Sequence, residues 1–314
     1  MAQPSAADVR PVDPVLTNLS RGYKNPMFHW DKIAPVKEVV EQSGTFFVYT
    51  KDFWFRRQTG AERSPEGPYL RVGYGVSTDT YRTIERGYEK ALGDVTSKMS
   101  QTPEALETTD VQFLANLMQL HLEKTVAGDV WATGKWGTDR TLTGTDQWSD
   151  YANSDPIADV ELAKRTARRL TGQVSYRMFV GALTWETLKE HPLLLDKYKH
   201  TQRGVLTEEL VAAALGVTQL QVMASVENTA AEGATFAGAD IWADNALIVA
   251  DNPAGLFVPA GASTIVWDEK GNVPWAVDNY YEDQTRSVIN RIFTHHVTKI
   301  IATDIGYFIA DTNA

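Results

Sequence analysis

The 314-residue sequence contains no cysteine. This absence excludes disulfides, thiol nucleophiles and cysteine-ligated zinc, and it fits assembly in a reducing compartment. Long apolar runs are also missing. The weakly polar stretch 210–226 is interrupted by Gly216, Thr218 and Gln221, whereas a membrane-spanning helix needs about 20 predominantly apolar residues. The first twenty residues lack the apolar run of about 7–15 residues that marks a secretory signal. We therefore expect neither a membrane segment nor export.

An excess of positive charge is missing as well. The chain has 30 Lys+Arg against 40 Asp+Glu, a net charge of −10, which is opposite in sign to a basic nucleic-acid clamp. The imbalance is uneven, because residues 1–100 hold 14 basic and 12 acidic side chains and the remainder holds 16 and 28. Two interpretations stay open: ordinary solvated surface, or a mildly basic N-terminal third that meets acidic surface on a neighbouring copy.

What is present supports a packed protein of mixed secondary structure. The sequence is 43% hydrophobic and 22% charged, which is enough apolar material for a large core. Apolar residues at three- and four-residue steps from Val111 to Val126 predict a long core helix, with Phe113 and Leu120 widening its apolar face. An amphipathic helix is predicted from about Asp159 to a closing Gly172. Segments rich in β-branched and aromatic residues predict strands near 175–180, 220–225, 240–250, 263–268 and 297–308. Strands and helices do not alternate regularly, so the fold class is α+β.

The N-terminal third predicts two projecting segments. Five prolines occur within residues 1–40, so we expect an extended arm there, one that needs a packed domain or another subunit to cover its aromatic side chains. Strand-like sequence then flanks a polar middle, about 56–70, that contains two glycines and two prolines. This pattern predicts a long β-hairpin whose tip projects from the body.

Motifs for chemistry are largely absent. The segment 128–136 superficially suggests a phosphate loop but has the wrong glycine spacing, and Trp136 stands where Ser or Thr should bind magnesium. His295 and His296 are neighbours in a predicted strand, so they should point to opposite faces and serve structural roles. Carboxylates and tryptophans in the loop 136–155 could form a hydrolase site, although carboxylates in turns more often cap helices.

Taken in order, several segments resemble the Hong Kong 97-like major capsid proteins of tailed phages. The resemblance runs from about Leu16 to Trp267 and rests on order and spacing rather than on one diagnostic motif. The matching segments are LTNLSRGYKNPMFHWDKIAPVKEV, SGTFFVYTKDFWFR, RVGYGVS, TLTGTDQWSDYANSDPIADV, HPLLLDKYKHTQRGVLTEELVAAALGV and NTAAEG, followed by Trp242.

This resemblance implies the fold of that family and a division of the chain into four parts. The parts are an N-terminal arm (1–40), an extended loop (50–82), a peripheral domain (41–49, 83–158 and 259–314, with a spine helix at 107–127) and an axial domain (159–258). Residues on the arm and the extended loop become the candidates for contact between subunits. These candidates are Tyr23, Phe28, Trp30, Phe53, Trp54, Phe55, Arg56, Arg57, Arg63, Glu66 and Arg71.

The resemblance also implies a function. The expected protein is a major capsid protein, not an enzyme, that forms hexamers and pentamers of an icosahedral shell around double-stranded DNA and needs no cofactor or metal. Expected partners are other copies of itself, a portal, a separate scaffolding protein, a decoration protein and non-specifically bound DNA, but no membrane. The expected location is the virion, after assembly in the host cytoplasm. An encapsulin-like nanocompartment shell protein and a carboxylate-dependent hydrolase are the alternatives.

Overall fold

The chain divides into two compact units. The structure is a computed structural model that describes residues 13–22, 25–49, 56–59, 61–63, 65–73, 75–99, 103–198, 207–251, 261–268 and 274–314. The first unit comprises Met1–Gln42 and Thr83–Ala314, and the second comprises Ser43–Arg82. Helices and strands do not alternate regularly along the chain, in agreement with the expected α+β class.

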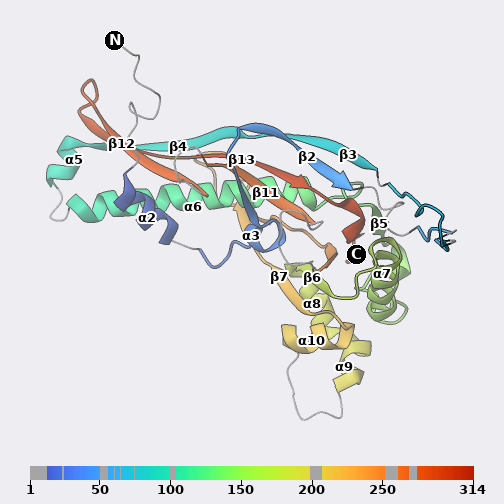
Figure 1. Cartoon of the computed structure of the whole chain (residues 1–314). Helices are drawn as coiled ribbons and strands as arrows, with labels where there is room; N and C mark the ends of the chain where they lie inside the picture. The colour runs from blue at the N-terminus through green and yellow to red at the C-terminus, as the bar shows by residue number, and fades with distance from the viewer. Residues whose placement is uncertain are drawn as a thin grey trace. The chain divides into compact units, whose positions relative to one another are not determined.

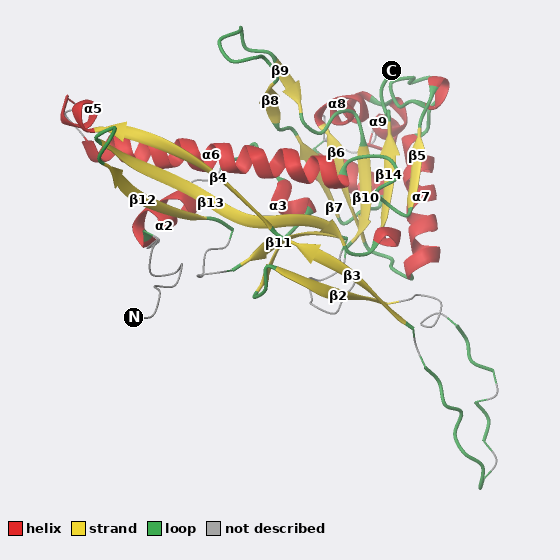
Figure 2. Ribbon diagram, turned by 90° about the horizontal axis from the view of Figure 1, so that it is seen from above, coloured by secondary structure: helices red, strands yellow, loops and turns green. Residues whose placement is uncertain are grey.

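A five-stranded sheet forms one half of the first unit. Its centre is the 14-residue strand β13, which pairs antiparallel with β4, β11 and β12, while β1 adds to β11 in parallel. Figure 2 shows β13 and β4 running side by side along one long helix. The bounds are β1 Val36–Val39, β4 Ile84–Gly93, β11 Ala262–Trp267, β12 Ala276–Glu282 and β13 Ser287–Ile300.

The long helix that lies along this sheet is α6 (Pro103–Val130), 28 residues or about 42 Å at 1.5 Å per residue. The expected long helix is thus confirmed, and it extends beyond 107–127 at both ends. Its core stripe is buried as predicted and consists of Val111, Leu114, Met118, Leu122 and Val126. Phe113, which we expected to widen that stripe, is instead 50% exposed, because it lies two residues, or about 200°, around the helix from Val111.

A second five-stranded sheet, in the order β5-β14-β10-β6-β7, forms the other half. Helices α7, α8, α9 and α10 belong to this part of the chain (Figures 1 and 2). The strands are β5 Thr138–Thr141, β6 Tyr176–Gly181, β7 Gln219–Met223, β10 Ala246–Ala250 and β14 Gly306–Ala310. The helices are α7 Pro156–Thr171, α8 Ala182–Glu190, α9 Pro192–Tyr198 and α10 Glu208–Leu215.

Two expected strands differ from the structure. The expected strand 240–250 is divided by a turn, so that β9 (Gly238–Asp240) pairs with β8 (Val226–Asn228) and only β10 joins the large sheet. The expected strand 297–308 belongs to two strands, because the short η2 helix (Thr303–Ile305) redirects the chain between β13 and β14. The segment 259–314, expected in one domain, therefore contributes to both sheets.

The N-terminal segment is more regular than expected. Pro14–Gly22 forms helix α2, because Pro14 stands at the first helical position and the Asp13 side chain accepts hydrogen bonds from Val15 N (2.8 Å) and Leu16 N (3.0 Å). A second short helix, α3 (Trp30–Ile33), follows. The prediction of an extended arm is therefore wrong for these residues, and residues 1–12 lie outside the described part.

The second unit contains the expected hairpin. β2 (Ser43–Tyr49) pairs antiparallel with β3 (Val76–Arg82), in register from Ser43 with Arg82 to Tyr49 with Val76. The hairpin unit begins at residue 43, earlier than the expected boundary at 50. Between the strands, the described residues of 56–75 form no helix or strand. In the first unit, α5 (Asp94–Met99) and the 3-10 helix η1 (Gly144–Asp146) complete the regular elements.

Gly181, where β6 meets α8, gives a test of the second sheet. A Cβ at this position would lie 1.8 Å from the carbonyl oxygen of Ala243, which itself has a positive φ of 46°. We expect Gly181→Ala to lower the free energy of unfolding by about 2–3 kcal/mol through overpacking. Gly128→Ala is the matched control, because Gly128 lies in α6 with nothing within 4 Å of its Cβ and should gain about 0.5–1 kcal/mol. Denaturant titration measures both; equal stability of the two variants would contradict the close contact.

Candidate assembly surfaces

The carboxylates that made a hydrolase conceivable are held in structural roles. Asp155 caps α7 by accepting hydrogen bonds from Ile157 N and Ala158 N, both at 3.0 Å. Asp159 accepts from the Trp148 indole at 3.0 Å and pairs with Arg140. Among the described residues, no group of three or more His, Asp or Glu side chains is arranged to hold a metal ion. The loop therefore matches the helix-capping interpretation better than the hydrolase alternative.

The histidine pair also packs structurally. His295 makes an edge-to-face contact with Trp267 on one face of the sheet, with ring centroids 5.0 Å apart. His296 faces α6, where its Nε2 lies 3.1 Å from Arg86 and its ring contacts His121. Burial, assisted by Arg86, lowers the pKa of His296 to about 3, so this side chain is neutral. The predicted opposite orientation of the two rings is confirmed.

The residue that sequence reasoning missed is Glu123, a fully buried carboxylate on α6. Its Oε2 accepts hydrogen bonds from His29 N (3.0 Å) and Trp30 N (2.8 Å), at the start of α3. Its Oε1 accepts from the Trp242 indole (2.6 Å) and contacts Ser225 Oγ. No ion pair joins Glu123 to a cation in the part of the chain that the structure describes. One side chain therefore ties the N-terminal segment to α6 and to the turn before β10.

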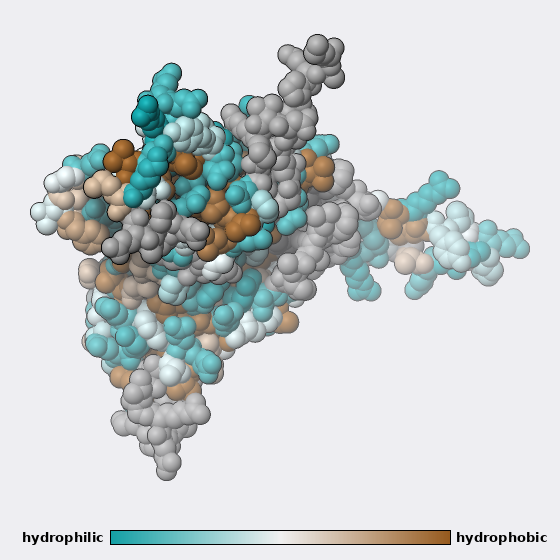
Figure 3. All heavy atoms as spheres, turned by 90° about the vertical axis from the view of Figure 1, so that its left-hand side faces the viewer, coloured by the Kyte–Doolittle hydropathy of each residue, from teal (hydrophilic) through white to brown (hydrophobic). Residues whose placement is uncertain are grey.

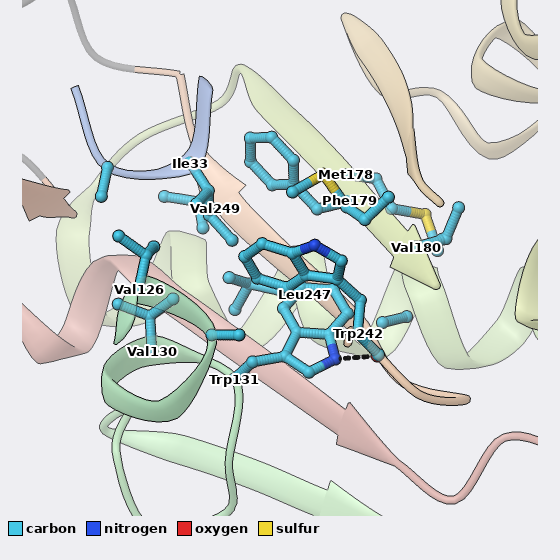
Figure 4. Close-up of a cluster of buried hydrophobic side chains, with 14 of the residues drawn as sticks. Ile33, Val126, Val130, Trp131, Met178, Phe179, Val180, Trp242, Leu247 and Val249 are labelled. Carbon is cyan, nitrogen blue, oxygen red and sulfur yellow. Dashed lines mark hydrogen bonds between the residues drawn. The ribbon is translucent and has the colours of Figure 1, made fainter. Parts of the chain in front are cut away.

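Buried aromatic side chains surround the same junction. Trp131 donates its indole N–H to the Trp242 carbonyl oxygen, and their rings meet edge to face with centroids 5.2 Å apart. Figure 4 shows these two tryptophans among Ile33, Val126 and Leu247, which come from α3, α6 and β10. A signal for the cluster was present in the sequence: Glu123 directly follows the apolar residue Leu122, in the middle of an apolar stripe.

The arm aromatics are covered by their own subunit. Phe28 is 8% exposed and Trp30 is 6% exposed, and both belong to the main hydrophobic cluster. Of the two expected covers, a packed domain or another subunit, the structure supplies the packed domain for these two side chains, because α3 docks on α6 through Glu123. Their contact with a neighbouring subunit stays a prediction. Tyr23 lies outside the described residues.

The candidates on the hairpin fall into three groups. Phe53, Trp54 and Phe55 lie outside the described residues. The side chains of Arg56, Arg57, Glu66 and Arg71 are exposed, so they remain available for contact.

Arg63 is also exposed but is engaged within its own loop. Its Nε donates to Gly67 O (2.6 Å), its Nη2 donates to Pro65 O (2.8 Å), and its guanidinium lies 4.5 Å from the centre of the Tyr69 ring. These contacts close the tip into a turn. Tyr69, Leu70 and Val72 beside it are 75%, 49% and 65% exposed, so the loop also offers apolar surface that our candidate set omitted.

Further exposed apolar side chains lie at one end of the first unit. Val95 and Met99 on α5 are 71% and 81% exposed, and Phe113 on α6 is 50% exposed. Figure 3, which views the side where α5 lies, shows apolar areas interspersed with hydrophilic ones. Among the described residues, no helix is both long enough and apolar enough to span a membrane.

Comparison with known sequences shows two curated relatives. The major capsid protein of Burkholderia phage BcepMu is 28% identical over 325 aligned positions, which cover 97% of this chain and 98% of the relative. The major capsid protein of Pseudomonas phage JBD67 is 26% identical over 204 positions, covering 61% of this chain and 60% of the relative. No protein-family model matches the chain.

Comparison with solved structures supports the same assignment of the fold. A phage-related protein from Bordetella bronchiseptica RB50 superposes with a TM-score of 0.76 at 21% identity, covering 96% of this chain and 98% of that one. The capsid of cyanophage P-SCSP1u gives a TM-score of 0.56 at 11% identity, covering 90% and 88%. The chain therefore has the Hong Kong 97-like capsid fold. It is a homologue of phage major capsid proteins.

Glu123 gives a test of the junction through pH. Burial raises the pKa of Glu123 above its ordinary value of 4.5, against opposing hydrogen bonds. The geometry agrees: Ser225 has one hydroxyl hydrogen but lies 2.8 Å from Met27 O as well as beside Glu123, so a protonated Glu123 satisfies both contacts. Because the folded chain holds this proton more tightly than the unfolded chain, the stability due to Glu123 falls as pH rises above about 4.5.

The measurement is the free energy of unfolding of the wild type minus that of Glu123→Gln, which does not titrate. We expect this difference to fall between pH 4.5 and 7. Glu161→Gln, which makes the same change at an exposed position of α7, is the matched control for the substitution itself. A difference that rises with pH for Glu123 would show that the hydrogen-bond donors outweigh the burial.

Proposed function

We propose that the chain assembles with copies of itself into hexamers and pentamers of an icosahedral shell that encloses double-stranded DNA. The observation that carries the proposal is the end-to-end match to a phage major capsid protein, over 97% of this chain and 98% of the relative. The role is structural rather than enzymatic. An encapsulin-like shell is disfavoured, since both curated relatives are phage capsid proteins.

We propose that contacts between subunits lie on the hairpin. An isolated two-stranded hairpin is only marginally stable in water, and the described residues of 56–73 expose almost all of their side chains. We infer that docking on a neighbouring subunit covers this loop. In this proposal the first sheet with α6 forms the peripheral domain, and the second sheet with α7 to α10 forms the axial domain at the capsomer centre.

The remaining partners follow from the same proposal. The chain would occupy the virion after assembly in the host cytoplasm, with a portal, a separate scaffolding protein and a decoration protein as partners. DNA contact would be electrostatic and independent of sequence. Electron microscopy of the expressed chain tests the shell directly: closed particles are expected, and a monodisperse monomer at high concentration would overturn the proposal. Nucleic acid inside purified virions separates a capsid from a compartment for protein cargo.

The loop arginines give a residue-level test. We expect the triple variant Arg56→Gln, Arg57→Gln, Arg71→Gln to keep the unfolding midpoint of the wild type but to lower the yield of closed shells at least tenfold. Each exposed ion pair contributes only about 0.2–1 kcal/mol, but every subunit of a shell repeats it. The control variant Lys98→Gln, Lys135→Gln, Lys189→Gln removes three exposed charges elsewhere. Normal shell yield from the loop variant would assign these arginines no role in assembly.

Covalent cross-linking between subunits is not expected. The founding member of the family joins a lysine on the extended loop to an asparagine of a neighbour. Within the extended loop (50–82), Lys51 stands near the start, away from the expected tip, and residues 56–82 contain arginines but no lysine. An arginine stays protonated and cannot act as the amine nucleophile. Shells boiled in detergent should therefore give one band near 34.9 kDa on a denaturing gel. A persistent ladder of oligomers would refute this.

A further inference from the structure

Helix α7 carries a basic face whose three exposed arginines have no polar partner among the described residues. Residues 101–314 hold 28 acidic against 16 basic side chains, yet α7 alone holds four of the basic ones within six residues, Lys164 to Arg169. Arg165, Arg168 and Arg169 are exposed, and none of them makes a hydrogen bond or an ion pair with the described part of the chain. Lys164 differs, because its Nζ donates to Leu215 O and to Gly216 O.

The three arginines share one face of the helix. At 100° per residue they span about 100° of its circumference, opposite the buried residues Val160, Ala163 and Ala167. The register is fixed by the Asp155 cap at one end and by Gly172, with a φ of 71°, at the other. The face is thus a rigid row, in which Arg165 and Arg169 are about 6 Å apart along the axis.

We propose that this face binds the phosphate backbone of duplex DNA inside the shell; the proposal rests on the proposed function above. Guanidinium groups bind phosphate through paired hydrogen bonds and keep their charge. A second copy of the chain is the weaker candidate, because the cores of protein–protein interfaces are more apolar than this face. Leu162, 40% exposed, is the one large apolar side chain exposed on it. Glu161 is its only acidic member, so the row keeps a net charge of +2.

The test compares DNA binding by three forms of the full-length chain: wild type, the variant Arg165→Gln, Arg168→Gln, Arg169→Gln, and the control Lys98→Gln, Lys135→Gln, Lys189→Gln. A fluorescent 20-base-pair duplex of arbitrary sequence is titrated with the unassembled subunits of each form at several salt concentrations, because a closed shell would keep the duplex away from its inner face. Each phosphate neutralised contributes about 0.9 to the slope of log K against log salt. We expect the arginine variant to lose at least tenfold in affinity at low salt and about 2–3 in slope, and the control to lose less than twofold.

Two results of the titration would overturn the inference: no binding by the wild type, or an equal loss in the control. Electron microscopy of each form under assembly conditions keeps the inference separate from the proposed function. If the arginine variant fails to close shells while the wild type succeeds, the face contacts a second copy and the DNA assignment is wrong. If the wild type itself forms no shells, the proposed function has failed, whatever the DNA titration shows.

Discussion

A carboxyl group removed from water needs donors or a proton of its own, and this requirement organises the centre of the first unit. Glu123 meets it with two backbone amides at the start of α3, one indole and one hydroxyl. Those groups come from segments nearly 200 residues apart in the sequence. The junction therefore forms only when the N-terminal segment, α6 and the turn carrying Trp242 have all reached their final positions.

Packing around the junction reinforces this interdependence. Trp131 and Trp242 are anchored to each other by a hydrogen bond and an edge-to-face contact, and Phe28 and Trp30 close the cluster on the side of α3. Burial of large aromatic side chains contributes most to stability where the polar N–H or O–H group of each side chain is also hydrogen-bonded. The first unit can therefore be stable by itself, whereas the hairpin of the second unit is a two-stranded ribbon with little core of its own.

Sequence patterns predicted the helices and the hairpin, but they did not predict features that depend on contacts of a single side chain. The stripe of α6, the β2–β3 hairpin and the α7 helix with Gly172 at its end all follow from periodicity and caps that are visible locally. Helix α2 was not predicted, because five prolines within residues 1–40 argue against regular helix, although one of them, Pro14, is well placed at a helix start. Glu123 was missed because its partners, Ser225 and Trp242, are about 100 residues away. The loop arginines were found as candidates, but the intramolecular role of Arg63 depends on a turn that composition does not reveal.

The position of β14 has a consequence for the order in which the protein is made. Residues 306–310 lie between β5 and β10 in the second sheet, although β10 is complete some 55 residues earlier along the chain. On the ribosome, β10 and β5 therefore emerge with a gap between them that only a late segment fills. A prematurely terminated product lacks the strand that joins the two halves of the sheet. Such a fragment leaves the second sheet incomplete, so folding of this half of the first unit depends on synthesis of almost the whole chain.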